Sequence, residues 1–322
     1  MRERAVALLV AAPFVLGMTT GTATEKAHPV FRFQDTAITE SSGLVALGRG
    51  LVVTVNDSGD SARVFVVDTS TGRTVGTTTW AGEPVDDEAL AAAGPGRVWV
   101  GDIGDNTTSR DSIRVTLVPV SRGNHAGALA SYELRYPQHR SYDAETLLAE
   151  PGTGRLFVVT KGVLGGRIYA APKRLSADGP NQLRPVAYAP GLVTDGTFVP
   201  DGDRVVLRDY NRFVELSYPG WRTLTDERLP VQRQGEGIAV TDDGRFLVSS
   251  EGIHQPVYSL VDPLAPPPAS ATPSSTPSAP VSRTGRELPE EPPADRDPRG
   301  FLVGAGVAVV ALLVLWRALR PR

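Results

Sequence analysis

Acidic side chains recur at corresponding places in this sequence, each beside a run of apolar residues. The stretch from Val100 to Asn106 reads VGDIGDN and continues an apolar run. Two aspartates and an asparagine offer hard oxygen atoms, the ligands that Ca²⁺ prefers in proteins. Asp and Asn also cap turns by accepting hydrogen bonds from nearby backbone amides. Which role applies depends on whether the fold gathers the other acidic residues at the same place.

Five segments share one pattern, in which polar or acidic residues and a small residue lead into a β-rich run. They begin at Glu40, Asp86, Asp143, Thr194 and Gly235 and read ESSGLVAL, DDEALAAA, DAETLLAE, TDGTFVPD and GEGIAVTD. A turn containing glycine follows each, and then a second run that ends in polar residues. The segments recur about every 40–57 residues, close to the roughly 40–50 residues of a four-stranded propeller blade.

The repeat predicts an all-β fold, a β-propeller, over residues 28–263. Short β-rich runs bounded by Gly, Asp and Pro fill this region, with no sustained helical periodicity. A β-sandwich would explain the strands but not the repeat. We expect five blades, because four units are nearly complete and a fifth stops one strand short. The run HPVFRFQD, before the first repeat, can supply the missing strand and close the ring with strands from both ends. Six blades remain the alternative if the long second unit contains another.

Propeller topology brings the repeated polar residues to one face. The loops that lead into each innermost strand and those that follow each second strand lie at the same end of the channel. We therefore predict an acidic channel mouth that takes a cation, with Ca²⁺ favoured. The predicted metal ligands are Glu88, Asp102, Asp105, Asn106, Glu145, Glu236 and Glu251. The predicted ligand-binding residues are Glu40, Asp57, Arg110, Lys161, Arg208 and Asp209.

Composition excludes several other kinds of site. The 322 residues contain no cysteine, which rules out disulfides, thiolate catalysis and cysteine-bound metals, and only four histidines. The formal net charge of −3 gives no basic excess for nucleic acid.

The two ends of the chain predict export and a membrane anchor. Two arginines, a short apolar run and then small residues predict a signal peptide over residues 1–23. A tract rich in Pro, Ser and Thr over residues 264–300 predicts a disordered stalk. Residues 301–319 predict a transmembrane helix, and the basic residues 320–322 a cytoplasmic tail. We therefore expect a single-pass protein of the cell membrane with its propeller on the extracellular side.

The motifs resemble a group of secreted bacterial WD40/YVTN-like β-propeller proteins, mostly without assigned activity. The resemblance covers nearly the whole of residues 28–263 and is carried by ESSGL, VNDSGD, VGDIGDNTTSR, DAETLL with RLFVVTKG, PDGDRVVLRDY, and GEGIAV with SSEG. It implies export and the propeller fold. A more distant similarity to esterase-like phytase propellers implies calcium and phosphate esters.

Three functions are compatible with these features. The first is binding of an extracellular ligand or protein partner at the acidic mouth. The second is a calcium-dependent hydrolase of phosphate esters, in which Lys161, Arg208 and Arg110 would hold the phosphate and a carboxylate would activate water. The third is a structural envelope protein. No Ser-His-Asp arrangement is visible in the sequence, and arginines at strand ends commonly pair with neighbouring acids, so we favour binding.

Overall fold

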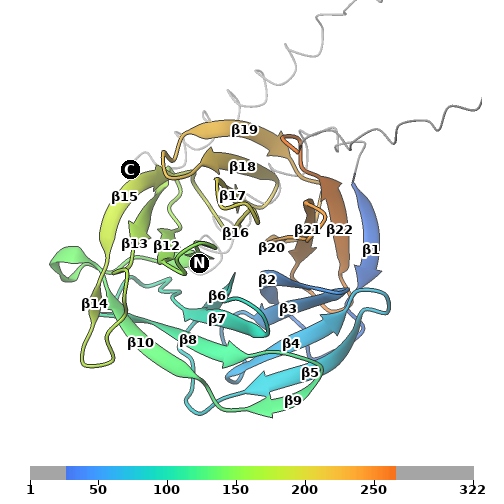
Figure 1. The fold of residues 1–322 in the computed structure, drawn as a ribbon, viewed down its shortest axis with the longest axis horizontal. Helices are drawn as coiled ribbons and strands as arrows, with labels where there is room; N and C mark the ends of the chain where they lie inside the picture. Colours follow the sequence, from blue (N-terminus) through green and yellow to red (C-terminus); the bar gives the residue numbers. More distant parts are fainter. Residues whose placement is uncertain (1–26, 266–322) are drawn as a thin grey trace, which may run out of the picture. The chain divides into compact units, whose positions relative to one another are not determined.

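The computed structural model describes residues 27–265, which form five mainly antiparallel sheets arranged as a ring (Figure 1). The five-bladed propeller predicted from the repeat is thus confirmed, and a sixth blade is not present in this region. The predicted signal peptide, the transmembrane helix and nearly all of the stalk lie outside the described residues. Within residues 27–265, no helix has the length and apolar character needed to cross a membrane.

Each blade begins with its innermost strand and continues outward. Blade 1 contains β2 (Ser41–Gly48), β3 (Leu51–Asn56), β4 (Arg63–Asp68) and β5 (Arg73–Thr79). Blade 2 contains β6 (Asp87–Ala92), β7 (Arg97–Asp102), β8 (Ile113–Pro119) and β10 (Ala130–Arg135). Blade 3 contains β11 (Ala144–Ala149), β12 (Leu156–Thr160), β13 (Gly166–Ala170) and β15 (Arg184–Ala189). Blade 4 contains β16 (Asp195–Phe198), β17 (Arg204–Arg208), β18 (Arg212–Ser217) and β19 (Thr223–Arg228).

Blade 5 closes the ring with strands from both ends of the propeller. Its order is β20 (Gly235–Val240), β21 (Arg245–Ser250), β22 (Pro256–Val261) and then β1 (His28–Arg32), the first strand in the chain. β1 pairs antiparallel with β22, with Phe31 opposite Val257. The N-terminal run therefore supplies the missing strand as predicted, and it covers an edge that would otherwise expose unpaired backbone groups.

Apolar side chains between neighbouring blades hold the ring together. The buried apolar residues fall into five clusters, and each joins two adjacent blades. One cluster contains Phe31 and Leu247 of blade 5 together with Leu44 and Phe65 of blade 1. Because both faces of a middle strand are covered, such strands read as continuous Val-rich runs, as in the RVFVVD of β4.

The long second unit is explained by strands that cross to the preceding blade. β9 (Gly123–Ala126) leaves blade 2 and pairs parallel with β5 on the outer edge of blade 1. In the same way β14 (Asn181–Gln182) leaves blade 3 and pairs parallel with β10 of blade 2. A short 3₁₀ helix, η1 (Pro137–His139), lies in the connection from blade 2 to blade 3.

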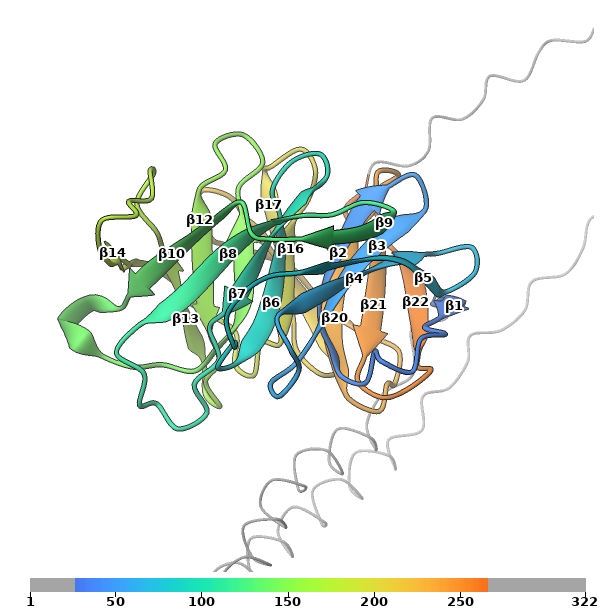
Figure 2. The ribbon, with the colours of Figure 1, turned by 90° about the horizontal axis from the view of Figure 1, so that it is seen from below.

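Seen from the side, the loops gather at two opposite faces of the ring (Figure 2). We call the face at which the innermost strands begin the mouth face. The start of each innermost strand pairs with the end of the next strand outward. These pairs are Ser41 with Asn56, Asp87 with Asp102, Ala144 with Thr160, Asp195 with Arg208, and Gly235 with Ser250. The repeated polar residues of the sequence therefore meet at the mouth face.

Candidate functional site

In four of the five innermost strands, a shift in strand register places a residue out of the regular ladder. The pairing is irregular near the start of β2, β6, β11 and β20, where it skips Ser42, Glu88, Glu145 and Glu236. Such bulges re-aim a side chain and are frequent beside functional sites. The three glutamates are only 4–5% exposed. In blade 4 the equivalent residue is Asp195, and there the ladder is regular.

The three glutamates belong to one group of charges at the centre of the mouth face. Burial raises the pKa of Glu236, and the neighbouring charges that act on it include Glu145, Lys161 and Glu251. The charges around Glu88 include Glu145, Asp57 and Asp86. We call this group the mouth cluster; it consists of Asp57, Asp86, Glu88, Glu145, Lys161, Glu236 and Glu251.

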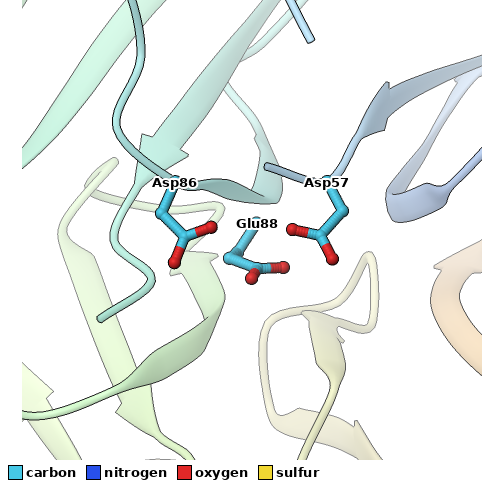
Figure 3. Close-up of side chains that lie close together, drawn as sticks. All are labelled: Asp57, Asp86 and Glu88. Carbon is cyan, nitrogen blue, oxygen red and sulfur yellow. The ribbon is translucent and has the colours of Figure 1, made fainter. Parts of the chain in front are cut away.

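Three carboxyl groups of the mouth cluster lie close enough to share one cation. Asp57, Asp86 and Glu88 each offer an oxygen, and these oxygens lie within 4.8 Å of one another. Figure 3 shows the three side chains converging, with Glu88 between the two aspartates. Asp86 is 8% exposed, and its Oδ1 has no hydrogen-bond partner among the described residues. A buried carboxylate oxygen without a partner is costly, so this atom marks a place where a positive ligand would be stabilised.

Crowding and burial hold protons in this part of the mouth cluster. Burial, followed by the charges of Glu145, Asp57 and Asp86, raises the pKa of Glu88 to about 12. Burial together with Asp57 and Asp143 raises the pKa of Asp86 to about 6. Glu88 also shares a hydrogen bond with Asp57. A bound cation would replace such a proton, because it stabilises the ionised form of the same groups.

The VGDIGDN stretch forms the wall behind these three carboxyl groups. The amides of Ile103 and Gly104 donate to the main-chain oxygen of Asp86 at 3.1 and 3.2 Å. A Cβ atom on Gly104 would lie 2.4 Å from Cγ of Asp86 and 2.8 Å from Cγ of Glu88. Glycine at this position therefore lets the loop pack directly against the two acidic side chains.

The aspartates of the same loop have partners within the protein. Asp105 accepts hydrogen bonds from the amides of Ser109 and Arg110, both at 2.9 Å. Asp102 forms an ion pair with Arg110 at 2.8 Å and accepts the amide of Asp86 at 3.0 Å. Asn106 is exposed. This geometry is that of turn capping for Asp105 and of an internal ion pair for Asp102 and Arg110.

Lys161 is the cation of the mouth cluster. Its Nζ forms an ion pair with Glu145 and lies 5.4 Å from the centre of the Tyr210 ring. Burial lowers the pKa of Lys161, but Glu145 and Tyr210 outweigh it and raise the pKa above its ordinary value. The ammonium group therefore stays protonated at neutral pH. Glu236 leaves its Oε2 buried with no hydrogen-bond partner among the described residues.

Arg208 is buried at the mouth end of β17, where it joins blades 4 and 5. It is 0% exposed and donates from Nη1 to the main-chain oxygens of Gly237 and Ser249 at 3.0 and 3.1 Å. Its Nε donates to the oxygen of Asp209 at 3.1 Å. Burial lowers the pKa of Arg208 to about 10, so it remains charged at neutral pH. These contacts favour a structural role over ligand binding.

Two other predicted ligand-binding residues, Asp209 and Glu40, lie on loops of the mouth face. Asp209 caps a turn by accepting the amides of Asn211 and Arg212, each at 2.9 Å, and pairs with the Arg212 side chain. Glu40 is exposed, and its main-chain oxygen accepts the amide of Asp57 at 2.9 Å. Burial and the charges of Asp57 and Glu40 raise the pKa of Glu251 to about 7.

Asp86 is the site residue that the sequence reasoning missed. It stands in the triplet Asp86-Asp87-Glu88, whose last two residues begin β6. Three consecutive acids at the start of a buried strand indicate more than one inward carboxyl group. The structure thus groups Asp57, Glu88, Glu145, Glu236 and Glu251 as predicted neighbours, adds Asp86, and gives other partners to Asp102 and Asp105.

The opposite end of the channel has a different chemistry. It holds a cavity of about 530 Å³ whose lining includes Val45, Ala92, Ala149 and Val240. The lining is largely apolar but also includes the charged residues Arg97, Glu150 and Asp242.

Comparison of the chain with protein-family models and with curated proteins gives no match. The function is therefore argued from the geometry of the mouth face.

Proposed function

We propose that this protein is a binding propeller of the cell surface, which takes up a ligand or partner at a mouth face loaded with Ca²⁺. The observation that carries the proposal is the Oδ1 of Asp86, a buried acceptor without a partner among the described residues, beside the oxygens of Asp57 and Glu88. The predicted signal peptide and membrane helix support the extracellular address.

The donor set fits Ca²⁺ better than the other common ions. Carboxylate oxygens are hard ligands, and Ca²⁺ accepts six to eight of them in flexible geometry. The chain has no cysteine, which disfavours zinc. Asp57, Asp86 and Glu88 can supply part of such a shell, and water or oxygens of a bound ligand would fill the rest.

Hydrolysis of phosphate esters is the weaker alternative. That reaction needs positive groups that are free to hold the phosphate. Arg208 donates its hydrogen bonds within the protein, largely to main-chain oxygens, and Arg110 is paired with Asp102. Lys161 remains at the mouth but is paired with Glu145. Binding requires none of these side chains to change partner, so we favour it.

The cation proposal is tested by thermal unfolding of the purified full chain, with Ca²⁺ and then with excess chelator. At a free concentration 100 times its Kd, the ion adds about 2.7 kcal/mol to the free energy of unfolding. Asp86→Asn keeps the shape of the side chain and removes its charge, and it should abolish the shift. Glu83→Gln is the matched control, because Glu83 is an exposed acid of the same loop. A shift that survives in Asp86→Asn, or no shift in the wild-type chain, would refute the site.

A further inference from the structure

Exposed apolar side chains stand on the loops of the mouth face. Val85, Val163, Leu164, Val231 and Ile253 are 50% exposed or more, and Leu164 is fully exposed. They lie on loops that join β5 to β6, β12 to β13, β19 to β20 and β21 to β22. All four loops belong to the mouth face, because each either leads into an innermost strand or follows a second strand. We call these five residues the apolar collar.

The collar is close to the mouth cluster. Val85 directly precedes Asp86, Val163 is two residues from Lys161, and Ile253 is two residues from Glu251. Two residues of extended chain span at most about 7 Å. Val85, Val163 and Ile253 therefore lie close to charged residues of the mouth cluster.

Exposed apolar residues elsewhere on the propeller have a simpler origin. Val186 and Tyr188 lie on β15, and Leu224 lies on β19, which are outermost strands of their blades. Single apolar residues on such edges are normal. A set of them on loop tips around a charged centre is the arrangement expected of an interface, with an apolar contact area and a polar anchor.

We propose that the collar and the mouth cluster together dock a protein segment that presents Lys or Arg side chains flanked by apolar residues. The inference rests on the proposed function, since it names the partner of the same face. The charged groups of the mouth cluster indicate that the partner should present a cationic side chain. The mouth cluster has six carboxyl groups, from Asp57, Asp86, Glu88, Glu145, Glu236 and Glu251, against the single ammonium of Lys161.

The mouth cluster offers six carboxyl groups, and its one positive side chain, Lys161, is already paired with Glu145. A cationic side chain of the partner and Ca²⁺ would use the same carboxyl oxygens. The peptide should therefore bind less tightly when the ion is present. An anionic lipid surface is disfavoured by the same charges.

The test is fluorescence anisotropy of the purified full chain with two labelled decapeptides. Both carry Leu and Phe on each side of a central pair, which is Lys-Arg in one peptide and Gln-Gln in the other. The Lys-Arg peptide should bind at least about ten-fold tighter than the Gln-Gln peptide. Glu236→Gln should reduce that preference, and circular dichroism will show that this variant is folded.

The collar is tested separately with Leu164→Asn. Losing one apolar anchor should weaken both peptides by about five-fold or more and leave the preference for Lys-Arg unchanged. Leu224→Asn is the matched control, because Leu224 is an exposed leucine of β19, away from the mouth face, and it should bind like wild type. Every titration is repeated with Ca²⁺ and with chelator. Peptide binding that does not respond to the ion supports docking while counting against the calcium site.

Two outcomes would overturn the docking proposal. The first is equal affinity for the Lys-Arg and Gln-Gln peptides, or no measurable affinity for either. The second is capture of the protein by phosphatidylcholine vesicles that Leu164→Asn abolishes, without peptide binding, since the collar would then be a membrane contact.

Discussion

Replacement of Arg208 by methionine tests whether this buried arginine stabilises the packing of blade 4 against blade 5. The guanidinium group donates to the main-chain oxygens of Gly237, Ser249 and Asp209 at 3.0–3.1 Å. Methionine replaces the aliphatic part of the arginine side chain but has no donor, so it would leave these acceptors inside the protein without their partner.

The magnitude follows from the number of lost hydrogen bonds. Each bond to a charged group contributes roughly 1.5–3 kcal/mol net, and three of them amount to about 5–9 kcal/mol. Burying the charge costs several kcal/mol, which methionine avoids. We therefore expect the free energy of unfolding to fall by about 3–5 kcal/mol, the usual cost of removing one partner from a buried charged contact.

Urea unfolding followed by circular dichroism measures the effect. Arg184→Met is the matched control, since Arg184 is exposed on β15, and its change should stay within about 0.5 kcal/mol. Arg208→Lys should also be destabilised, because an ammonium cannot reproduce the planar fork that reaches two carbonyls at once. A loss below about 1 kcal/mol in Arg208→Met, with weaker ligand binding, would refute the structural role and restore the ligand-binding role predicted from the sequence.

Two further predictions concern the packing of the innermost strands and the pH dependence of stability. Gly237→Ala should lower the free energy of unfolding by about 2–4 kcal/mol in a urea titration. The added Cβ would lie 2.4 Å from Ser249 Oγ and 2.9 Å from Leu44 Cβ. Gly179→Ala is the control and should change the free energy of unfolding little, because no atom lies within 4 Å of its added Cβ. Burial and the charge of Asp262 raise the pKa of Glu215, which is paired with Arg204, from 4.5 to about 7. The folded state then binds more protons than the unfolded state in that range, so the free energy of unfolding should fall as pH rises from about 4.5 to 7, and Glu215→Gln should flatten the slope.

The fold was predictable because similar segments recur at nearly regular intervals along the sequence. Each blade buries both faces of its middle strands, which produces Val-rich runs at nearly regular intervals. The run HPVFRFQD before the first repeat belonged to no other blade and could therefore be assigned to the incomplete one. β9 and β14 were not predictable. The segments GNHA and NQ carry no apolar alternation, and their parallel pairing with a neighbouring blade exists only once the ring has formed.

The candidate site was predictable only to the level of the mouth face. The repeat places Glu88 and Asp102 at the same end of blade 2, and as sequence both are acids next to glycine or alanine. Their fates differ because the bulge turns Glu88 out of the ladder, whereas Asp102 meets Arg110 at 2.8 Å. A one-residue shift in register thus gives Glu88 and Asp102 different partners. Neither the shift nor the side-chain pairing can be predicted from composition or from the spacing of residues.

Blade 4 shows what distinguishes a structural carboxyl group from one that is open to a ligand. Asp195 occupies the position equivalent to Glu88 and Glu236, yet its side chain accepts the amides of Gly196, Ile238 and Leu44 at 2.7, 2.8 and 3.3 Å. Those amides come from blades 4, 5 and 1, so Asp195 ties three blades together at the centre of the ring. Glu236 is also buried but leaves its Oε2 without a partner among the described residues, and in blade 2 Asp86 does the same with its Oδ1. The unmet hydrogen-bonding capacity of these two oxygens, and not acidity alone, is the observation that supports the proposal of a cation or a cationic side chain at the mouth.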